Sequence, residues 1–132
     1  LNIDLIICSP ADRTKHTCNI INKNNIPVIF DERLIERDVG IYENKDWKNI
    51  DRKEFWNYYS TKYTGLETMK SVYKRVAECL DEVKEKYRDK TILLVTHGGT
   101  LRAIYWYFNG IPEDGNVGYD MHSNCEIKEY EL

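Results

Sequence analysis

The hydrophobic pattern is clearest between residues 91 and 108. An unbroken apolar or β-branched run from Thr91 to Val95 is typical of a strand buried on both faces. In an open α/β sheet, the turn after such a strand lies where ligands bind, and the N–H groups of a following helix favour an anion there. Here a His97-Gly98-Gly99 turn is followed by apolar side chains at a helical spacing, namely Leu101, Ile104, Tyr105 and Phe108. The pattern therefore predicts a strand, a tight turn and a helix, with His97 at a candidate binding point.

The first thirty residues predict two further strands and a helix. Apolar runs indicate strands over residues 1–8 and 26–30, and Pro27 favours an edge position for the second of them. Ser9-Pro10 ends the first strand and opens a helix, because proline is tolerated in a first helical turn.

The rest of the chain completes an α/β pattern. Residues 31–64 are rich in charges and aromatic side chains with weak periodicity, so we expect short helices packed as a flap, whose aromatic residues either contact substrate or form a local core. Apolar positions spaced three or four apart predict an amphipathic helix over residues 67–87, and alternation predicts a last strand over residues 125–132. The order predicts a three-layer α/β/α protein with a mostly parallel sheet and helices on both sides.

Composition narrows the class of protein. A length of 132 residues suits one domain with a real core. The net charge of −3 argues against general nucleic-acid binding. The apolar runs are too short to cross a membrane, so we expect a cytoplasmic protein. The four cysteines contain no C-x-x-C pair and the three histidines have no zinc spacing, so we expect free thiols, no metal and no other cofactor.

Polar residues follow two of the predicted strands. Ser9 and Arg13 come after the first, and His97 comes after the strand that ends at Val95. Because the carboxyl ends of parallel strands meet at one edge of a sheet, we expect these side chains to converge. The plainer alternative is that His97 is an ordinary loop residue, since a strand, a glycine pair and a helix are common in α/β proteins.

Four segments resemble the motifs of the histidine phosphatase (phosphoglycerate mutase-like) superfamily. Residues 8–17 resemble S-S-P-x-x-R-A-x-Q-T, residues 32–40 resemble L-x-E-x-x-x-G, residues 65–68 resemble a G-E-S/T helix start, and residues 95–102 resemble V-S-H-G-G-x-x-R. They occur in the family's order and span most of the chain. The resemblance implies phosphoryl transfer through a phosphohistidine, on a small phosphorylated metabolite.

The resemblance also implies roles for particular residues. Arg13, His97 and Gly98 would bind the phosphoryl group, with His97 donating to a phosphoryl oxygen as charge builds on it. Glu36 would be the general acid and base, which requires a raised pKa that the aromatic flap could supply by desolvation. Arg37 would contact the substrate. The plainer alternatives are a solvated surface arginine for Arg13 and a loop carboxylate paired with Arg33 or Arg37 for Glu36.

One family motif has no counterpart. The L-x-R-H-G segment that carries the nucleophilic histidine is not found, and neither His16 nor His122 is preceded by Arg or followed by Gly. We therefore expect an incomplete domain that starts at the family's second strand and also lacks its last. The family's sheet order would place the missing first strand beside residues 91–96. Its loss would expose a sheet edge that can pair with a second copy of the chain.

Three functions remain in competition. The first is a phosphomonoesterase or a phosphoglycerate mutase-like enzyme whose nucleophile is not in these residues, with the short flap favouring a phosphatase. The second is an inactive pseudo-phosphatase fragment that binds phosphorylated ligands or a protein. The third, an esterase with His97-Gly98-Gly99 as oxyanion loop, lacks a glycine-flanked nucleophilic serine.

Overall fold

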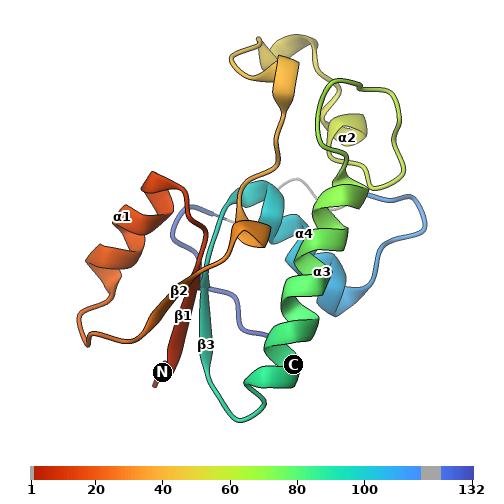
Figure 1. The fold of residues 1–132 in the computed structure, drawn as a ribbon. Helices are drawn as coiled ribbons and strands as arrows, with labels where there is room; N and C mark the ends of the chain where they lie inside the picture. The colour runs from red at the N-terminus through yellow and green to blue at the C-terminus, as the bar shows by residue number, and fades with distance from the viewer. Residues whose placement is uncertain (1, 117–122) are drawn as a thin grey trace.

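The fold is built on three parallel strands flanked by helices (Figure 1). The structure is a computed structural model and describes residues 2–116 and 123–132. Its main elements are β1 (Leu5–Cys8), α1 (Asp12–Ile21), β2 (Val28–Phe30), α3 (Met69–Lys86), β3 (Ile92–Val95) and α4 (Gly98–Asn109). The strand order in this sheet is β2-β1-β3, and both pairings are parallel. The α/β class predicted from the sequence is confirmed.

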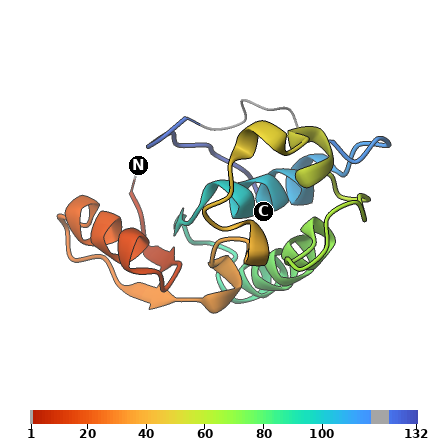
Figure 2. The same ribbon diagram turned by 90° about the horizontal axis from the view of Figure 1, so that it is seen from above.

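Strand β1 is the centre of the sheet and is covered on both faces. Leu5 and Ile7 pack in one hydrophobic cluster with Cys79 and Val83 of α3, whereas Ile6 and Cys8 pack in another with Cys18 of α1. Successive side chains of a strand point to opposite faces, so this division puts α1 and α3 on opposite sides of the sheet, as Figure 2 shows. The three layers follow directly from the β1 sequence.

Strand β2 is the edge strand that Pro27 predicts. Its three residues pair only with β1, in a register that puts Ile7 opposite Ile29, and Ile29 and Phe30 are largely exposed. Strand β3 pairs with the other side of β1. Its side chains pack on both faces, as expected, because Ile92 and Leu94 lie in the cluster with α3 and Leu93 in the cluster with α1. Residues 92–94 are nevertheless only partly buried. The reason is that β3 has a strand on one side only within the described residues.

The long helix α3 begins and packs as its sequence predicts. Thr68 caps it by accepting a hydrogen bond from the backbone N–H of Ser71 at 3.1 Å, which satisfies one of the free donors of the first turn. Its apolar stripe, Met69, Val72, Val76 and Leu80, packs against Ala103, Ile104 and Trp106 of α4. Helix α4 itself begins at Gly98, three residues before the predicted Leu101, because Gly98 and Gly99 already belong to the helix while His97 is its extended N-cap.

The flap over residues 31–64 consists of short helices, as predicted. They are η1 (Glu32–Leu34), η2 (Gly40–Tyr42), η3 (Trp47–Asn49) and α2 (Arg52–Phe55). Its aromatic side chains gather around the fully buried ring of Phe55, in edge-to-face contacts with centroids 5.0 to 5.8 Å apart, from Tyr42, Trp47, Trp56 and Tyr63. Of the two readings of these aromatics, the local core is the one that these contacts support.

The strand predicted over residues 125–132 is not formed. Cys125 has a positive φ of 63°, Ile127 is 70% exposed, and no described residue of this segment is in a strand. The segment instead has a turn at its start and no regular secondary structure after it, and Tyr130 stacks on Phe108 of α4 with ring centroids 4.4 Å apart. Alternation alone does not make a strand, because a strand also needs a neighbour to share its backbone hydrogen bonds.

Smaller predictions also have outcomes. The helix expected from Ser9-Pro10 starts two residues after Pro10, at Asp12, and Leu1 of the first predicted strand lies outside the described residues. All four cysteines are free thiols, as expected; Cys8, Cys18 and Cys79 are buried and Cys125 is exposed. Within the described ranges, none of the helices has the length and apolar character that crossing a membrane requires.

Candidate active site

His97 lies where the sequence predicts, between the end of β3 and the first turn of α4. It is the N-cap residue of α4 and is only 6% exposed. Its Nδ1 atom is 3.1 Å from Nε of Arg13, and its Nε2 atom is 2.7 Å from Oγ of Ser9. The structure therefore brings together the polar ends of β1 and β3.

These two contacts determine which ring nitrogen of His97 carries the proton. A guanidinium can only donate, so Nδ1 must accept the hydrogen bond from Arg13. The proton of the neutral ring then lies on Nε2, which donates to Ser9 Oγ. Burial lowers the pKa of His97 below its usual value; Glu36 opposes this, and Arg13 and Arg75 add to it. The geometry and the shift both favour a neutral imidazole.

The turn after β1 is held by its own polar side chains. Thr14 donates from Oγ1 to the carbonyls of Ser9 at 2.9 Å and Ala11 at 2.8 Å, while the Ser9 N–H donates to the carbonyl of Val95 at 2.9 Å. These bonds tie the start of α1 to the end of β3. Arg13, one position before Thr14, remains on the exposed surface with its guanidinium against His97. Sequence reasoning assigned no role to Ser9 or Thr14, although both lie within the motif.

Glu36 reaches the same turn from the flap. Its Oε2 atom accepts from the N–H of Gly99 at 3.2 Å, and Oε1 accepts from the N–H of Arg37 at 2.8 Å. The N–H of Gly99 is in the first turn of α4, where a helix has no acceptor of its own. A Cβ at Gly99 would lie 2.5 Å from Oε1 of Glu36 and 3.0 Å from the Trp56 ring. The close approach of the carboxylate therefore requires glycine there.

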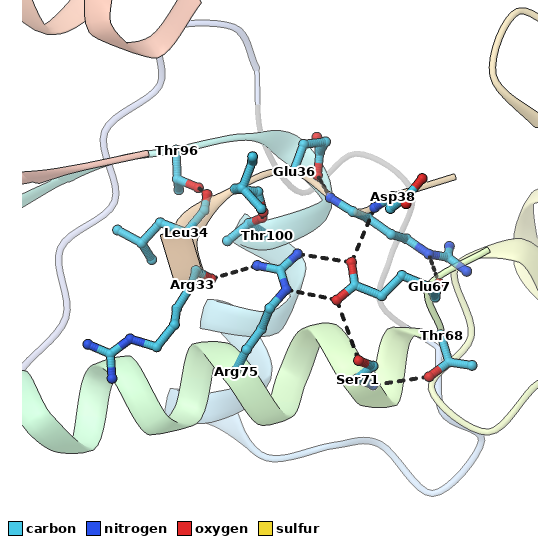
Figure 3. A network of polar contacts seen from close by, with 12 residues as sticks. Arg33, Leu34, Glu36, Asp38, Glu67, Thr68, Ser71, Arg75, Thr96 and Thr100 are labelled. Carbon is cyan, nitrogen blue, oxygen red and sulfur yellow. Dashed lines mark hydrogen bonds and ion pairs between the residues drawn. The ribbon is translucent and has the colours of Figure 1, made fainter. Parts of the chain in front are cut away.

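Three side chains hold the backbone just before Glu36 (Figure 3). The consecutive carbonyls of residues 33, 34 and 35 accept hydrogen bonds from Arg75 Nη1 at 2.6 Å, Thr96 Oγ1 at 2.6 Å and Thr100 Oγ1 at 2.8 Å, respectively. Thr96 and Thr100 lie on either side of the His97-Gly98-Gly99 turn, so their hydrogen bonds hold the segment before Glu36 next to that turn. Sequence reasoning missed all three residues; the only signal is that Thr96 directly precedes His97.

Arg37 is occupied by the protein itself. Its Nε donates to the Glu67 carbonyl at 2.7 Å and its Nη1 donates to the Phe55 carbonyl at 2.5 Å. The guanidinium also lies over the rings of Phe55 and Trp56, 4.6 and 5.1 Å from their centroids. Burial lowers the pKa of Arg37 to about 10, which leaves it cationic at neutral pH. These contacts join the Glu36 segment to the aromatic core of the flap.

The remaining candidates lie as follows. Gly98 is exposed at the start of α4, and a Cβ there would have no atom within 4 Å. Its N–H is thus part of an open helix N-terminus. His16 is exposed on α1, and His122 lies outside the described residues. Across residues 2–116 and 123–132, no group of three or more His, Cys, Asp or Glu side chains could hold a metal ion.

The fold agrees with what comparison with known proteins finds. The chain belongs to the histidine phosphatase superfamily (branch 1), whose family profile it matches over residues 1–132. It is 30% identical over 118 residues to phosphoserine phosphatase 1 of Hydrogenobacter thermophilus, covering 83% of this chain and 56% of that protein.

Other relatives extend this similarity. The protein named "Probable phosphoglycerate mutase GpmB" of Salmonella choleraesuis is 31% identical over 120 residues, covering 85% of this chain and 56% of its own length. The solved structure of YhfR from Bacillus stearothermophilus superposes with a TM-score of 0.72 at 27% identity, covering 86% of this chain and 60% of that one. The chain thus spans somewhat more than half the length of these relatives, which include phosphatases and mutases.

Proposed function

We propose that these residues form the phosphate-binding part of a histidine phosphatase-type enzyme that transfers a phosphoryl group from a small phosphorylated metabolite. The observation that carries the proposal is the contact between Arg13 and His97 at the N-terminus of α4, beside the Glu36 carboxylate. A cationic fork, a ring N–H and the backbone N–H of Gly98 at the start of a helix suit a phosphoryl dianion. A mutase-like transfer uses the same groups.

The contact geometry leaves Arg13 able to bind phosphate. Only Nε of Arg13 contacts His97, so the two terminal nitrogens, which form the fork toward two phosphoryl oxygens, are not part of that contact. The Nε2–H of His97 would move from Ser9 to a phosphoryl oxygen as negative charge builds there. Gly98 would add its backbone N–H.

Glu36 would act as general acid toward the leaving oxygen. Its carboxylate is bound to the same helix turn that starts at His97, through the N–H of Gly99. A proton donor must lie within hydrogen-bond reach of the oxygen that it protonates, and a substrate held at His97 would have its ester oxygen near this turn. The buried Arg37 would support Glu36 rather than contact substrate, since its Nε and Nη1 bind backbone carbonyls.

The covalent step needs a nucleophile that residues 1–132 do not contain. In the family this is the histidine of L-x-R-H-G, and the sequence has no such motif. Catalysis is therefore proposed for these residues together with that motif, and a phosphate-binding module without turnover is the second candidate function. The observation behind the second candidate is that Arg13 and His97 come together within these 132 residues.

A titration with inorganic phosphate tests the shared part of both candidates. Recorded by NMR on the 132-residue chain, it should shift the ring resonances of His97 and the backbone N–H of Gly98, with little change at β2. Even a weak phosphate site should have a Kd on the order of tens of millimolar or lower. The absence of any shift at His97 at such phosphate concentrations would therefore contradict the proposal. A phosphatase assay then separates the candidates: turnover is expected only when the R-H-G segment is present.

A further inference from the structure

The segment around Glu36 has no regular secondary structure to hold it. Residues 35–39 lie in neither a helix nor a strand, so their backbone groups need partners from elsewhere in the fold. From the His97 side, Thr100 binds the carbonyl of Ile35, and Thr96 binds the carbonyl of Leu34 just before this segment. Further hydrogen bonds to this part of the backbone come from one ion pair, formed by Arg75 of α3 and Glu67 just before that helix (Figure 3).

The Arg75–Glu67 pair has a two-pronged geometry. Arg75 Nε lies 2.8 Å from Glu67 Oε1, and Arg75 Nη2 lies 3.1 Å from Oε2. Both side chains are only 18% exposed, so water screens the pair less than it screens an ordinary surface ion pair. The third guanidinium nitrogen, Nη1, is left to donate to the Arg33 carbonyl at 2.6 Å.

The same pair contacts the chain on both sides of Glu36. Before it, Arg75 binds the Arg33 carbonyl. After it, Glu67 Oε2 accepts from the Asp38 N–H at 3.2 Å, and the Glu67 backbone exchanges further hydrogen bonds with Asp38 and with the side chain of Arg37. One ion pair thus fixes both flanks of the proposed general acid without touching its carboxylate.

We propose that Glu67 and Arg75 are positioning residues that set the place of the Glu36 carboxylate at the N-terminus of α4. The inference rests on the proposed role of Glu36 in phosphoryl transfer. Neither residue contacts the reacting atoms. Their effect passes through the backbone of residues 33–38 to the hydrogen bond between Glu36 Oε2 and the Gly99 N–H.

The Gly99 N–H reports on this position without any substrate. Within the described residues its acceptor is Glu36, because a first-turn N–H has none within its helix. Arg75→Lys keeps the charge but loses the planar fork that pairs two N–H groups with the two Glu67 oxygens. Glu67→Gln keeps the side-chain size and one acceptor oxygen but removes the charge. Hydrogen exchange by NMR on the 132-residue chain should be at least about tenfold faster at Gly99 in both variants, since a hydrogen bond to a charged group contributes on that order.

The matched control is Lys90→Gln. It removes the exposed pair between Lys90 and Asp4, which lies before the starts of β1 and β3, at the end of the sheet away from residues 33–38. Exchange at Gly99 should be unchanged in this variant. The amide of Ile7, in the centre of β1, reports on the fold as a whole and should keep its protection in all three variants.

Two results would overturn the inference. One is unchanged exchange at Gly99 in Arg75→Lys and Glu67→Gln. The other is equal acceleration at Gly99 and Ile7, which would assign the pair to global stability instead. The phosphate titration of His97 is a separate measurement. If the parent chain does not bind phosphate but exchange at Gly99 is faster in both variants, the proposed function is refuted and the positioning role stands.

Discussion

Arg13 Nε and His97 Nδ1 are 3.1 Å apart, although 84 positions separate the two residues in the chain. They meet because β1 and β3 are adjacent and parallel, so that the segments leaving their carboxyl ends start at the same edge of the sheet. An oriented guanidinium beside a helix N-terminus needs little reorganisation to receive an anion, which lowers the cost of binding.

The first prediction concerns Arg13. Arg13→Lys should weaken inorganic phosphate binding by about tenfold, because lysine keeps a point charge but loses the planar fork and the bond to Nδ1 of His97. Calorimetric titration measures this. Arg88→Lys, at an exposed position after α3, is the control and should bind as the parent does. Equal affinities for all three chains would remove Arg13 from the site.

The second prediction concerns pH. Burial lowers the pKa of His97, so the unfolded chain binds more protons than the folded one between that lowered pKa and about 6.5. The free energy of unfolding should therefore fall as pH falls through this window. Urea unfolding from pH 7.5 to 5 measures it, with His97→Asn as the reference whose profile is flatter. An NMR titration that puts the His97 midpoint above 6.5 would contradict the prediction.

The third prediction concerns Glu36 in a chain that also carries the R-H-G motif. Glu36→Gln should lower turnover of alkyl phosphates by about 10²–10⁴-fold and spare aryl phosphates, because a general acid matters most for a basic leaving oxygen. Steady-state kinetics on both substrate types measures the difference. Equal losses on the two would give Glu36 a structural role.

The fourth prediction concerns two glycines. Gly40 has φ +51°, and a Cβ there would collide with the carbonyl of Gly65, so Gly40→Ala should cost more than about 1 kcal/mol of the free energy of unfolding. Gly98→Ala has open space and extends a helix, so it should leave stability unchanged or raise it. Urea unfolding of both variants at pH 7.5 compares their stabilities. Equal midpoints would show that the backbone near Gly65 moves at little cost to make room for a Cβ at position 40.

The fifth prediction concerns the open edge of β3. Val95 faces β1, since its carbonyl accepts from Ser9, and alternation then turns the backbone groups of Leu94 and Ile92 toward the other side. No strand pairs with them there in the described parts of the chain. We expect the 132-residue chain to self-associate through this edge. Size-exclusion chromatography with hydrogen exchange measures it, and a monodisperse monomer with a strongly protected Leu94 amide would contradict it.

Local pattern accounts for most of the fold. The buried run of β1, the apolar spacing of α3 and the strand-turn-helix from Ile92 to Asn109 were all readable, because each is a property of neighbouring residues. The strand predicted over residues 125–132 failed for the opposite reason. Its alternation is local, but the partner that a strand needs is not.

The residues of the candidate site also fall into two groups, those that the sequence motifs identify and those that only the structure shows. The motifs identified Arg13, Glu36, His97 and Gly98 as candidates, since each stands at the end of a strand or in a characteristic segment. The sequence by itself thus determined which residue types are present and at which end of the sheet they lie.

Only the tertiary structure decided which side chains hold Glu36 and which are occupied elsewhere. Arg75, Thr96 and Thr100 are polar residues on a helix or a strand end, and nothing in their neighbours shows that they bind the carbonyls of residues 33–35. The local sequence likewise does not predict that Arg37 is buried against the ring of Phe55. Hydrogen bonds between distant segments depend on how the layers pack, and packing sums contacts over the whole chain, so no local pattern contains them.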